Sequence, residues 1–402
     1  MIFLYNILLT IAFPFVYLFM KIKLDKSEIK NRMRINFYGK NTIWIHAASV
    51  GEVNAATPLI KNLLSQFENI LVTTITTTGK KTAESISNEI SVNLLPLDYF
   101  SIMQNTFKRI NPKIVILIET EFWPNLLYRA NINNIPIVIV NGRISENSYP
   151  LYKKSKFFWK TPWKAIRAVG AQSEIDANRF RNLNFANVNN THNLKFCLKL
   201  NNFESSEIRK KYNVSKDDFI VVFGSSRPGE EKFLLDSLDK IMIDNLKLFI
   251  APRHLKRIPE IQKIFSEKDA KLLSENKSAK IIIIDKMGIL NQFYSICDIA
   301  IVGGSFFDFG GHNPLEPAYY AKPIIMGKHF SSCKSSVTEL KKRNAIQISE
   351  NLHDSINYIY SNHNNAIEMG KNAKLTLLDN DSSIMMNMQL IKDILEETVE
   401  KK

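Results

Sequence analysis

The chain has 402 residues, 45% of them hydrophobic, and its 53 Lys and Arg against 39 Asp and Glu give a formal net charge of +14. This composition is typical of a globular protein, and the length favours two domains over one. Three scattered cysteines, Cys197, Cys297 and Cys333, argue against a disulfide framework and against a zinc site. The positive charge favours an anionic partner. We expect no nucleic acid, because the sequence has no zinc finger, no RNP-type aromatic signature and no long basic arm.

The first predicted element is an apolar helix over residues 1–20, which carry no charged side chain. At about 1.5 Å per residue such a helix spans roughly one hydrocarbon core. Lys21, Lys23 and further basic residues follow, so the positive-inside rule places the rest of the chain in the cytoplasm. Without a basic n-region or a small-residue cleavage site, the segment is expected to be an uncleaved single-pass anchor. A helix docked on the protein is the alternative.

Beyond the anchor, apolar β-branched runs alternate with longer helical segments, which predicts an α/β fold with parallel sheets covered by helices on both faces. The polar stretch 201–218 is the predicted domain boundary, giving domains over 21–205 and 206–402. The end of the chain, from about residue 382, is predicted to be an amphipathic helix that packs back on the first domain. The predicted strands are Ile43–Ala47, Ile70–Thr76, Ile114–Ile118, Ile137–Val140, Phe219–Phe223, Leu246–Ala251, Lys280–Asp285 and Ile299–Gly303.

Polar and glycine-rich segments follow most of these strands. Parallel strands place their carboxyl ends on one edge of a sheet, and two such edges that face each other make a cleft between domains, a favoured place for ligands. The segments are Ser49–Glu52, Thr78–Gly79, Glu119–Glu121, Asn141–Arg143, Ser225–Glu231, Pro252–His254 and Gly303–Pro317.

The last of these segments, GGSFFDFGGHNPLEP over Gly303–Pro317, is the most informative. Its four glycines let backbone N–H groups approach a ligand, and a helix that starts near Asn313, with Pro314 at its first position, points its positive dipole end there. Glu316 in the first turn is suited to hold two ribose hydroxyls. The segment therefore predicts a site for a phosphate and its attached sugar.

Glu52 has two interpretations. Ser49-x-x-Glu52 is the capping-box pattern of a helix start, and it also places a carboxylate at the predicted cleft as a general base. Glu119 and Glu121 share one face if the strand before them continues, but a turn begins there, so we expect only one to reach the chemistry.

Two cationic side chains are further candidates. Arg253 follows a buried strand and is placed to bind a phosphate, or else to form a surface ion pair. Lys195 is suited to stabilise developing negative charge, although the sequence alone does not separate it from other lysines. We expect no metal and no cofactor, since no His, Asp or Glu cluster has ligand spacing. The mixed aromatic and basic segment Tyr152–Arg167 predicts a membrane-interface patch, a solvated helix face being the alternative.

Taken together, these motifs resemble the 3-deoxy-D-manno-octulosonic acid (Kdo) transferases of Gram-negative bacteria. The resemblance runs from the N-terminus to about Phe330. The motifs that carry it are HAASVGE, ETEFWPN, NGRIS, NLKF, GEE, APRH, VGGSFFDFGGHNPLEP and PIIMGKH.

The resemblance implies a GT-B fold of two Rossmann-like domains, the first binding the lipid A precursor (lipid IVA) and the second the donor CMP-Kdo. It implies inverting transfer of Kdo in lipopolysaccharide core biosynthesis at the inner membrane. Glu52 then matches the proton acceptor, and Glu119 and Lys195 match the groups that stabilise the transition state. The matching donor contacts are Pro252, Arg253, Met287, Gly288, Ile289, Asn313, Pro314, Leu315 and Glu316.

The chain departs from the family pattern at three places. Ile289 stands where Glu is usual, Ser226-Arg227 replaces Thr-His, and Gly142 replaces Ala. Two other readings stay open: a different GT-B nucleotide-sugar enzyme, such as an epimerase or a transferase with another donor, and a membrane-tethered module that binds anionic lipid. An epimerase does not need a membrane anchor. In a lipid-binding module, replacing Glu52 would leave lipid binding intact.

Overall fold

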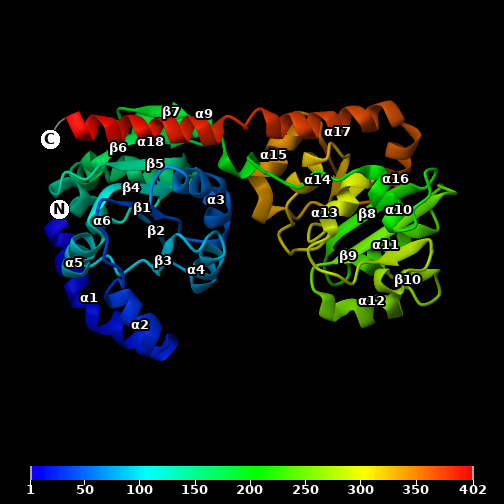
Figure 1. Ribbon diagram of the computed structural model, residues 1–402, viewed down its shortest axis with the longest axis horizontal. Helices are drawn as coiled ribbons and strands as arrows, with labels where there is room; N and C mark the ends of the chain where they lie inside the picture. The colour runs from blue at the N-terminus through cyan, green and yellow to red at the C-terminus, as the bar shows by residue number, and fades with distance from the viewer. Residues whose placement is uncertain (1, 401–402) are drawn as a thin grey trace. The chain divides into compact units, whose positions relative to one another are not determined.

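The structure, a computed structural model, describes residues 2–400 and divides into two compact units. Unit 1 comprises Met1–Cys197 and Asn380–Lys402, and unit 2 comprises Leu198–Asp379. The chain therefore leaves unit 1 once and returns to it at the C-terminus, as the colours of Figure 1 show. The change of unit lies a few residues before the polar stretch 201–218, and the segment from Asn380 onward belongs to unit 1 rather than to the second domain.

Unit 1 is built on seven parallel strands in the order β3-β2-β1-β4-β5-β6-β7. Successive residues of a strand point to opposite faces, so Ile43 and Ile45 enter one core cluster while Trp44 enters the other. Both faces are covered, which is why the central strands read as continuous apolar runs. The strands are β1 (Thr42–His46), β2 (Ile70–Thr74), β3 (Ser91–Leu94), β4 (Pro112–Ile118), β5 (Ile137–Gly142), β6 (Ile166–Ala171) and β7 (Val188–Asn190).

The helices of unit 1 cover the two faces of this sheet. The C-terminal helix α18 packs with α3, β5 and β6, and its residues Ile384, Met388 and Ile391 enter the same buried cluster as Ile43 (Figure 1). The helices are α1 (Ile2–Lys23), α2 (Lys26–Met33), α3 (Val50–Leu64), α4 (Thr77–Glu84), α5 (Phe100–Ile110), α6 (Pro124–Ile132), α7 (Ser148–Lys154), α8 (Lys156–Trp159), α9 (Glu174–Asn182) and α18 (Ser383–Glu400), with 3-10 turns η1 (Pro162–Ala165) and η2 (Leu194–Phe196).

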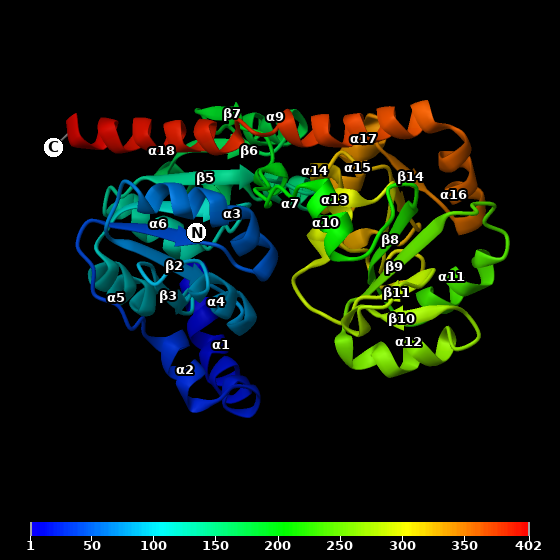
Figure 2. The ribbon, with the colours of Figure 1, turned by 45° about the vertical axis from the view of Figure 1, so that its right-hand side comes forward.

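Unit 2 repeats the architecture, with seven parallel strands in the order β10-β11-β9-β8-β12-β13-β14 (Figure 2). Its strands are β8 (Phe219–Ser226), β9 (Leu246–Pro252), β10 (Ala270–Leu272), β11 (Ile281–Ile283), β12 (Ile299–Val302), β13 (Ile324–Met326) and β14 (Ile346–Ile348). Its helices are α10 (Ser205–Lys211), α11 (Glu230–Leu238), α12 (Ile258–Ile264), α13 (Leu290–Ile296), α14 (Leu315–Tyr319), α15 (Lys334–Lys342), α16 (Leu352–Ser361) and α17 (His363–Leu378), with 3-10 turns η3 (Leu255–Arg257), η4 (Leu273–Glu275) and η5 (Ser331–Cys333). Two such units are the α/β architecture that the sequence predicted.

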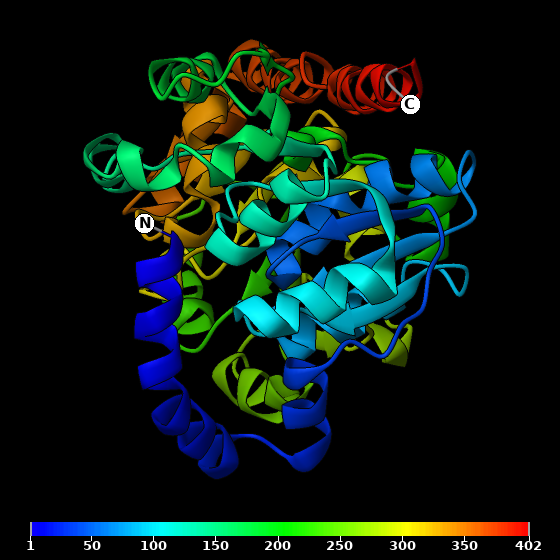
Figure 3. The ribbon, with the colours of Figure 1, turned by 90° about the vertical axis from the view of Figure 1, so that its left-hand side faces the viewer.

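Helix α1 is three residues longer at its C-terminal end than the predicted anchor, and it is long and apolar enough to cross a membrane, with a mean hydropathy of 2.1. It contacts α6 of the same unit, and in Figure 3 it is the blue helix that starts at the N-terminus. Tyr5 donates to Asp98 Oδ2 at 3.3 Å, and Asn6 exchanges two side-chain hydrogen bonds with Asn125, at 2.9 and 2.8 Å. The helix is thus held by polar contacts along its first turns, while its other side carries exposed apolar residues.

Candidate active site

Glu52 lies in the first turn of α3, directly after β1. Ser49 is the N-cap, and its Oγ accepts from Glu52 N at 3.4 Å. The Glu52 carboxylate accepts from Ala48 N at 2.7 Å and from Ser49 Oγ at 2.9 Å, so the capping pattern is formed in full. A Cβ added at Gly51 would meet only Ser49 Oγ, at 3.8 Å, so there is open space beside the backbone of the residue before Glu52.

The surroundings of Glu52 shift its proton affinity in opposing directions. Burial raises the pKa of this carboxyl, and the negative charges of Glu119 and Glu121 raise it further, while the bonds from Ala48 and Ser49 lower it; the net shift is upward. A carboxylate with a raised pKa is a stronger proton acceptor, which is the property a general base needs.

Glu119 and Glu121 follow β4 and lie near Glu52. Glu119 pairs with Lys195, with 2.9 Å between Oε1 and Nζ, and it adopts a left-handed backbone at φ 61°. Such a backbone is costly for a residue with a side chain, and strained residues of this kind cluster at functional sites. Glu121 is held instead by the indole of Trp123, at 2.9 Å, and lies 3.8 Å from His46 Nε2. The two carboxylates therefore have different partners.

Lys195 is positioned by two asparagines whose role sequence reasoning missed. Asn141, fully buried at the end of β5 with φ 56°, accepts from Leu194 N at 3.0 Å, and Asn193 Oδ1 accepts from Lys195 N at 3.0 Å. The Asn-Gly-Arg segment after a strand was the available signal. The carboxyl edge of unit 1 thus gathers Glu52, Glu119 and Lys195.

In unit 2 the glycine-rich segment after β12 is arranged differently from the prediction. The fully buried carboxylate of Glu230 accepts hydrogen bonds from the backbone N–H groups of Gly304 (2.8 Å), Ser305 (3.0 Å) and Phe306 (3.0 Å), and from Arg227 N (2.8 Å). These donors were expected to face a ligand. They are occupied by a side chain of the same unit, because a buried carboxylate needs several donors to offset its desolvation.

The helix after this segment also differs from the expectation. It begins at Leu315, two residues after Asn313, with Pro314 as its N-cap rather than its first residue, and it has only five residues. Asn313 Oδ1 accepts from Leu315 N at 3.1 Å, so Asn313 closes the turn before the helix. Glu316 is half-buried. Burial raises the pKa of its carboxyl, the charge of Arg253 lowers it, and the net shift is upward. A helix this short offers little dipole, because the effect requires aligned peptide units.

Several cationic groups of unit 2 gather around the ends of β8 and β9. Arg227 Nη1 is 3.0 Å from His254 Nε2, and the guanidinium lies 5.4 Å from the ring centre of Phe309. The pKa of His312 is lowered to about 4. Burial is the largest cause, and the positive charges of Arg253, Arg227 and His254 add to it. These groups make a locally positive environment that is suited to an anion.

The other predicted donor residues lie on the same edge. Pro252 is buried at the end of β9, and Met287 is exposed. Gly288 has φ 80°, and a Cβ there would meet nothing within 4 Å, so the backbone is accessible. Ile289 is partly buried and packs against a core cluster that includes Phe293.

Comparison with known proteins places these features in a family. The family model described as 3-deoxy-D-manno-octulosonic-acid transferase (kdotransferase) matches residues 27–198. A Haemophilus influenzae protein named 3-deoxy-D-manno-octulosonic acid transferase is 30% identical over 424 aligned positions, covering 99% of both chains. This chain belongs to the Kdo transferase family. A Rickettsia bellii protein of the same name is 32% identical over 87% of this chain and 88% of its own.

Three further matches, one in sequence and two in structure, give the wider setting of this chain. A bifunctional glycosyltransferase/methyltransferase of Fusobacterium nucleatum is 38% identical over 84% of this chain, which spans 56% of that relative's length. A crystal structure of a Rickettsia africae glycosyltransferase aligns with a TM-score of 0.55 at 15% identity, covering 91% of this chain and 100% of the other. A UDP-GlcNAc 2-epimerase from Neisseria meningitidis aligns at 0.57 and 12% identity, over 87% of this chain and 99% of its own. At such identities the structural matches show the GT-B fold alone.

The aromatic and basic segment Tyr152–Arg167 of this Kdo transferase differs from the predicted membrane patch. Trp159 and Trp163 are buried and stack with 5.6 Å between ring centres, in a cluster that includes Phe122. The aromatic rings serve the core because they pack on one another more favourably than they contact water. Phe157, at 65% exposed, is the aromatic residue of the segment that remains on the surface.

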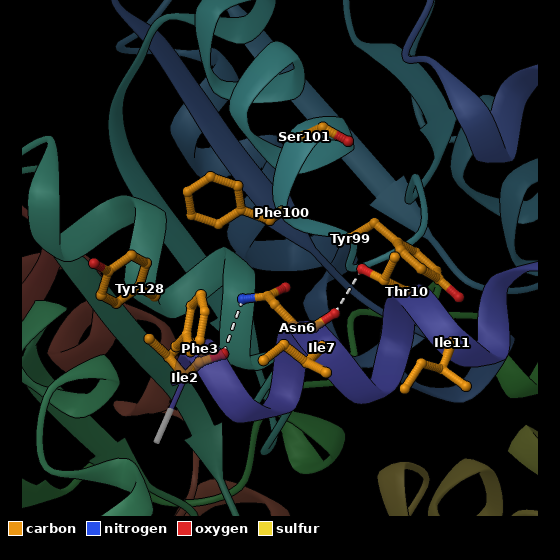
Figure 4. A pocket seen from close by; sticks show the side chains of 10 residues that line it. All are labelled: Ile2, Phe3, Asn6, Ile7, Thr10, Ile11, Tyr99, Phe100, Ser101 and Tyr128. Atoms are coloured by element: carbon orange, nitrogen blue, oxygen red, sulfur yellow. Dashed lines mark hydrogen bonds between the residues drawn. The ribbon is translucent and has the colours of Figure 1, made fainter.

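An apolar groove of about 700 Å³ lies between α1 and the start of α5 (Figure 4). The side chains of Phe3 and Ile7 come from α1, and those of Tyr99 and Phe100 lie opposite them. Asn6 accepts at its carbonyl oxygen from Thr10 Oγ1 at 2.7 Å, which satisfies that polar group within the helix. Exposed apolar residues of α1 and of the start of α5 therefore form this groove.

Proposed function

We propose that this chain transfers Kdo from CMP-Kdo to a hydroxyl of the lipid A precursor lipid IVA with inversion, in lipopolysaccharide core biosynthesis. Unit 1 would bind the lipid acceptor and unit 2 the donor. The observation that carries the proposal is the set of Glu52, Glu119 and Lys195 at one edge of unit 1, in a chain of this family.

In the proposed step Glu52 takes the proton of the acceptor hydroxyl. The oxygen of that hydroxyl then attacks the anomeric carbon of Kdo. The bond between that carbon and the phosphate oxygen of CMP breaks, and CMP leaves with the bonding electrons. Because a phosphate leaves readily, stabilising its charge is more useful than a strong acid. Glu119 and Lys195, already paired at 2.9 Å, would stabilise the charge that develops in the transition state.

For the donor we propose contacts with Pro252, Arg253, the backbone of Met287–Ile289, and Asn313–Glu316. Gly288 has an accessible backbone, and Glu316 is a half-buried carboxylate suited to the ribose hydroxyls. In this proposal arginines supply the positive charge at this edge of unit 2.

We propose that α1 attaches the enzyme to the cytoplasmic face of the inner membrane. Its exposed side carries Phe15 (74% exposed), Phe19 (61%) and Ile22 (72%), and Lys21 and Lys23 end the helix. Because its first turns are bonded to Asp98 and Asn125, the helix would enter the membrane with its free side rather than cross it as an isolated span.

The test is mass spectrometry of the lipid after incubation of detergent-solubilised protein with lipid IVA and CMP-Kdo. The expected result is a mass gain of whole Kdo units, absent with Glu52→Ala. Folded protein that gives no gain, but that converts UDP-N-acetylglucosamine, would replace the proposal with the epimerase alternative. A gain that persists in Glu52→Ala would refute the role of Glu52 and leave the transferase activity standing.

A further inference from the structure

Three backbone donors of the glycine-rich segment of unit 2 are already occupied and do not face a donor phosphate. The N–H groups of Gly304, Ser305 and Phe306 all donate to Glu230, which is fully buried. A phosphate brought to these donors would have to displace a buried carboxylate, which would then lie unpaired. Beside these three occupied groups, the side chains nearby are the donors that remain for a phosphate.

Arginines in this part of unit 2 fall into two kinds. Arg257 is neutralised, because its guanidinium bonds Glu231 at 2.7 and 3.0 Å and Glu260 at 3.0 and 3.1 Å. Arg227 and Arg253, in contrast, form no ion pair of 4 Å or less with a carboxylate of the described residues, although Glu316 exerts a longer-range attraction on Arg253. Arg227 instead contacts another potential cation, His254, at 3.0 Å.

Two polar atoms of this cluster also lack a partner. Within the described part of the chain, Arg227 Nε and His312 Nε2 are buried and form no hydrogen bond. A buried donor without a partner is costly, so a ligand that supplies acceptor oxygens would be bound favourably. His312 is fixed in place, because its backbone N–H donates to Gly303 O at 3.0 Å and its ring lies against Gly304.

We infer that Arg227 and His312, together with Arg253, form the site that binds the phosphate of the nucleotide donor. The inference rests on the proposed function for the identity of the nucleotide, but the phosphate chemistry follows from the cluster itself. Arg227 has a planar guanidinium that can donate two parallel hydrogen bonds to phosphate oxygens. His312, with a pKa of about 4, is neutral at pH 7 and donates one N–H.

Arg227 is the residue to test, because it stands where the family pattern has His and has no established role. The probes are CMP and cytidine, titrated into the full-length protein in detergent by calorimetry. Arg227→Gln is expected to weaken CMP binding tenfold or more and to leave cytidine binding within twofold, because only CMP carries the phosphate. Arg227→Lys keeps the charge but not the planar fork, so its CMP affinity is expected to lie between those of the native protein and Arg227→Gln.

Lys256→Gln is the matched control. Lys256 is exposed and its charge also acts on His254, but it is not one of the residues proposed to bind the phosphate. It is expected to change CMP affinity less than threefold. Thermal unfolding of each variant separates loss of contact from loss of fold. Unchanged CMP affinity in folded Arg227→Gln, or equal losses for CMP and cytidine, would overturn the inference.

The outcome is distinguishable from failure of the proposed function. If the native protein binds CMP in a phosphate-dependent way that Arg227→Gln abolishes, the inference holds even when no Kdo is transferred. If the native protein binds UDP over uridine instead, and Arg227→Gln abolishes that preference, the phosphate site stands with a different base. No phosphate-dependent binding of either nucleotide to folded native protein would overturn it.

Discussion

Glu52 both caps α3 and carries the carboxylate that we propose as the proton acceptor, and the two tasks are separable by substitution. In Glu52→Gln the amide oxygen can still accept from Ala48 N, but it cannot take a proton. We expect Kdo transfer to fall by about 10²-fold or more and the melting temperature to change little. Ser49→Ala is the control: it should cost about 1 kcal/mol of stability and keep most of the activity. A native rate in Glu52→Gln would contradict the assignment.

The acid side of the pH profile follows from the raised pKa of Glu52. The base works only when ionised, so kcat/KM is expected to fall as the pH drops through that pKa, at a pH above the value of about 4.3 for an ordinary Glu. Glu121→Gln removes one of the charges that raise the pKa, so the inflection should move to lower pH. Glu89→Gln, an exposed and unrelated carboxylate, should leave it in place. If the inflection stays at the same pH in Glu121→Gln, Glu52 is not the titrating group.

At the scale of elements, Glu230 fastens the glycine-rich segment after β12 to the first turn of α11. Glu230→Gln offers one amide oxygen where four N–H groups converge, and its NH2 group points at donors. With about 1–3 kcal/mol for each buried group left unpaired, we expect a loss of about 3 kcal/mol or more, measured by urea unfolding. Glu260→Gln, whose carboxylate is half exposed, should cost about 1 kcal/mol or less. Equal effects would contradict the fastening role.

Helix α1 is expected to account for membrane attachment. Phe15→Ser with Phe19→Ser removes two exposed aromatic side chains, each worth about 1.5–3 kcal/mol when buried in an apolar phase, so the fraction bound to vesicles should fall at least tenfold. Met242→Ser, which removes an equally exposed apolar residue (78%) from unit 2, is the control and should bind as the native protein does. Flotation with phospholipid vesicles measures both, and equal binding of the two variants would exclude α1 as the attachment.

At the scale of the whole molecule, unit 2 is one continuous segment, whereas unit 1 needs both ends of the chain. A fragment of residues 198–379 is therefore expected to fold alone and to show a cooperative thermal transition by circular dichroism. A fragment of residues 1–197 lacks α18 and exposes the cluster that Ile391 and Ile394 complete, so it should fold only when residues 380–402 are supplied as a peptide. Independent folding of 1–197 would show that α18 is dispensable.

Much of the fold could be predicted because it depends on local pattern. All eight strands predicted from apolar runs are present, since central strands buried on both faces are apolar throughout. The six missed strands are short, three to six residues, and several carry polar residues, as β3 (Ser91–Leu94) and β7 (Val188–Asn190) do. Ile166 and Arg167 end the segment predicted to be a membrane-interface patch, but they begin β6, because the sheet that receives them is made of distant segments.

By itself the sequence determined the α/β class, the apolar N-terminal helix, the family and the carboxyl-edge positions of Glu52, Glu119 and Arg253, because these follow from periodicity and from motifs next to strands. Only the tertiary structure decided which groups the motifs face. The glycine-rich N–H groups bond Glu230, more than seventy residues away in the chain, and Arg227 lies with His254 rather than with a carboxylate. Such pairings depend on burial and on long-range packing, which no local pattern encodes.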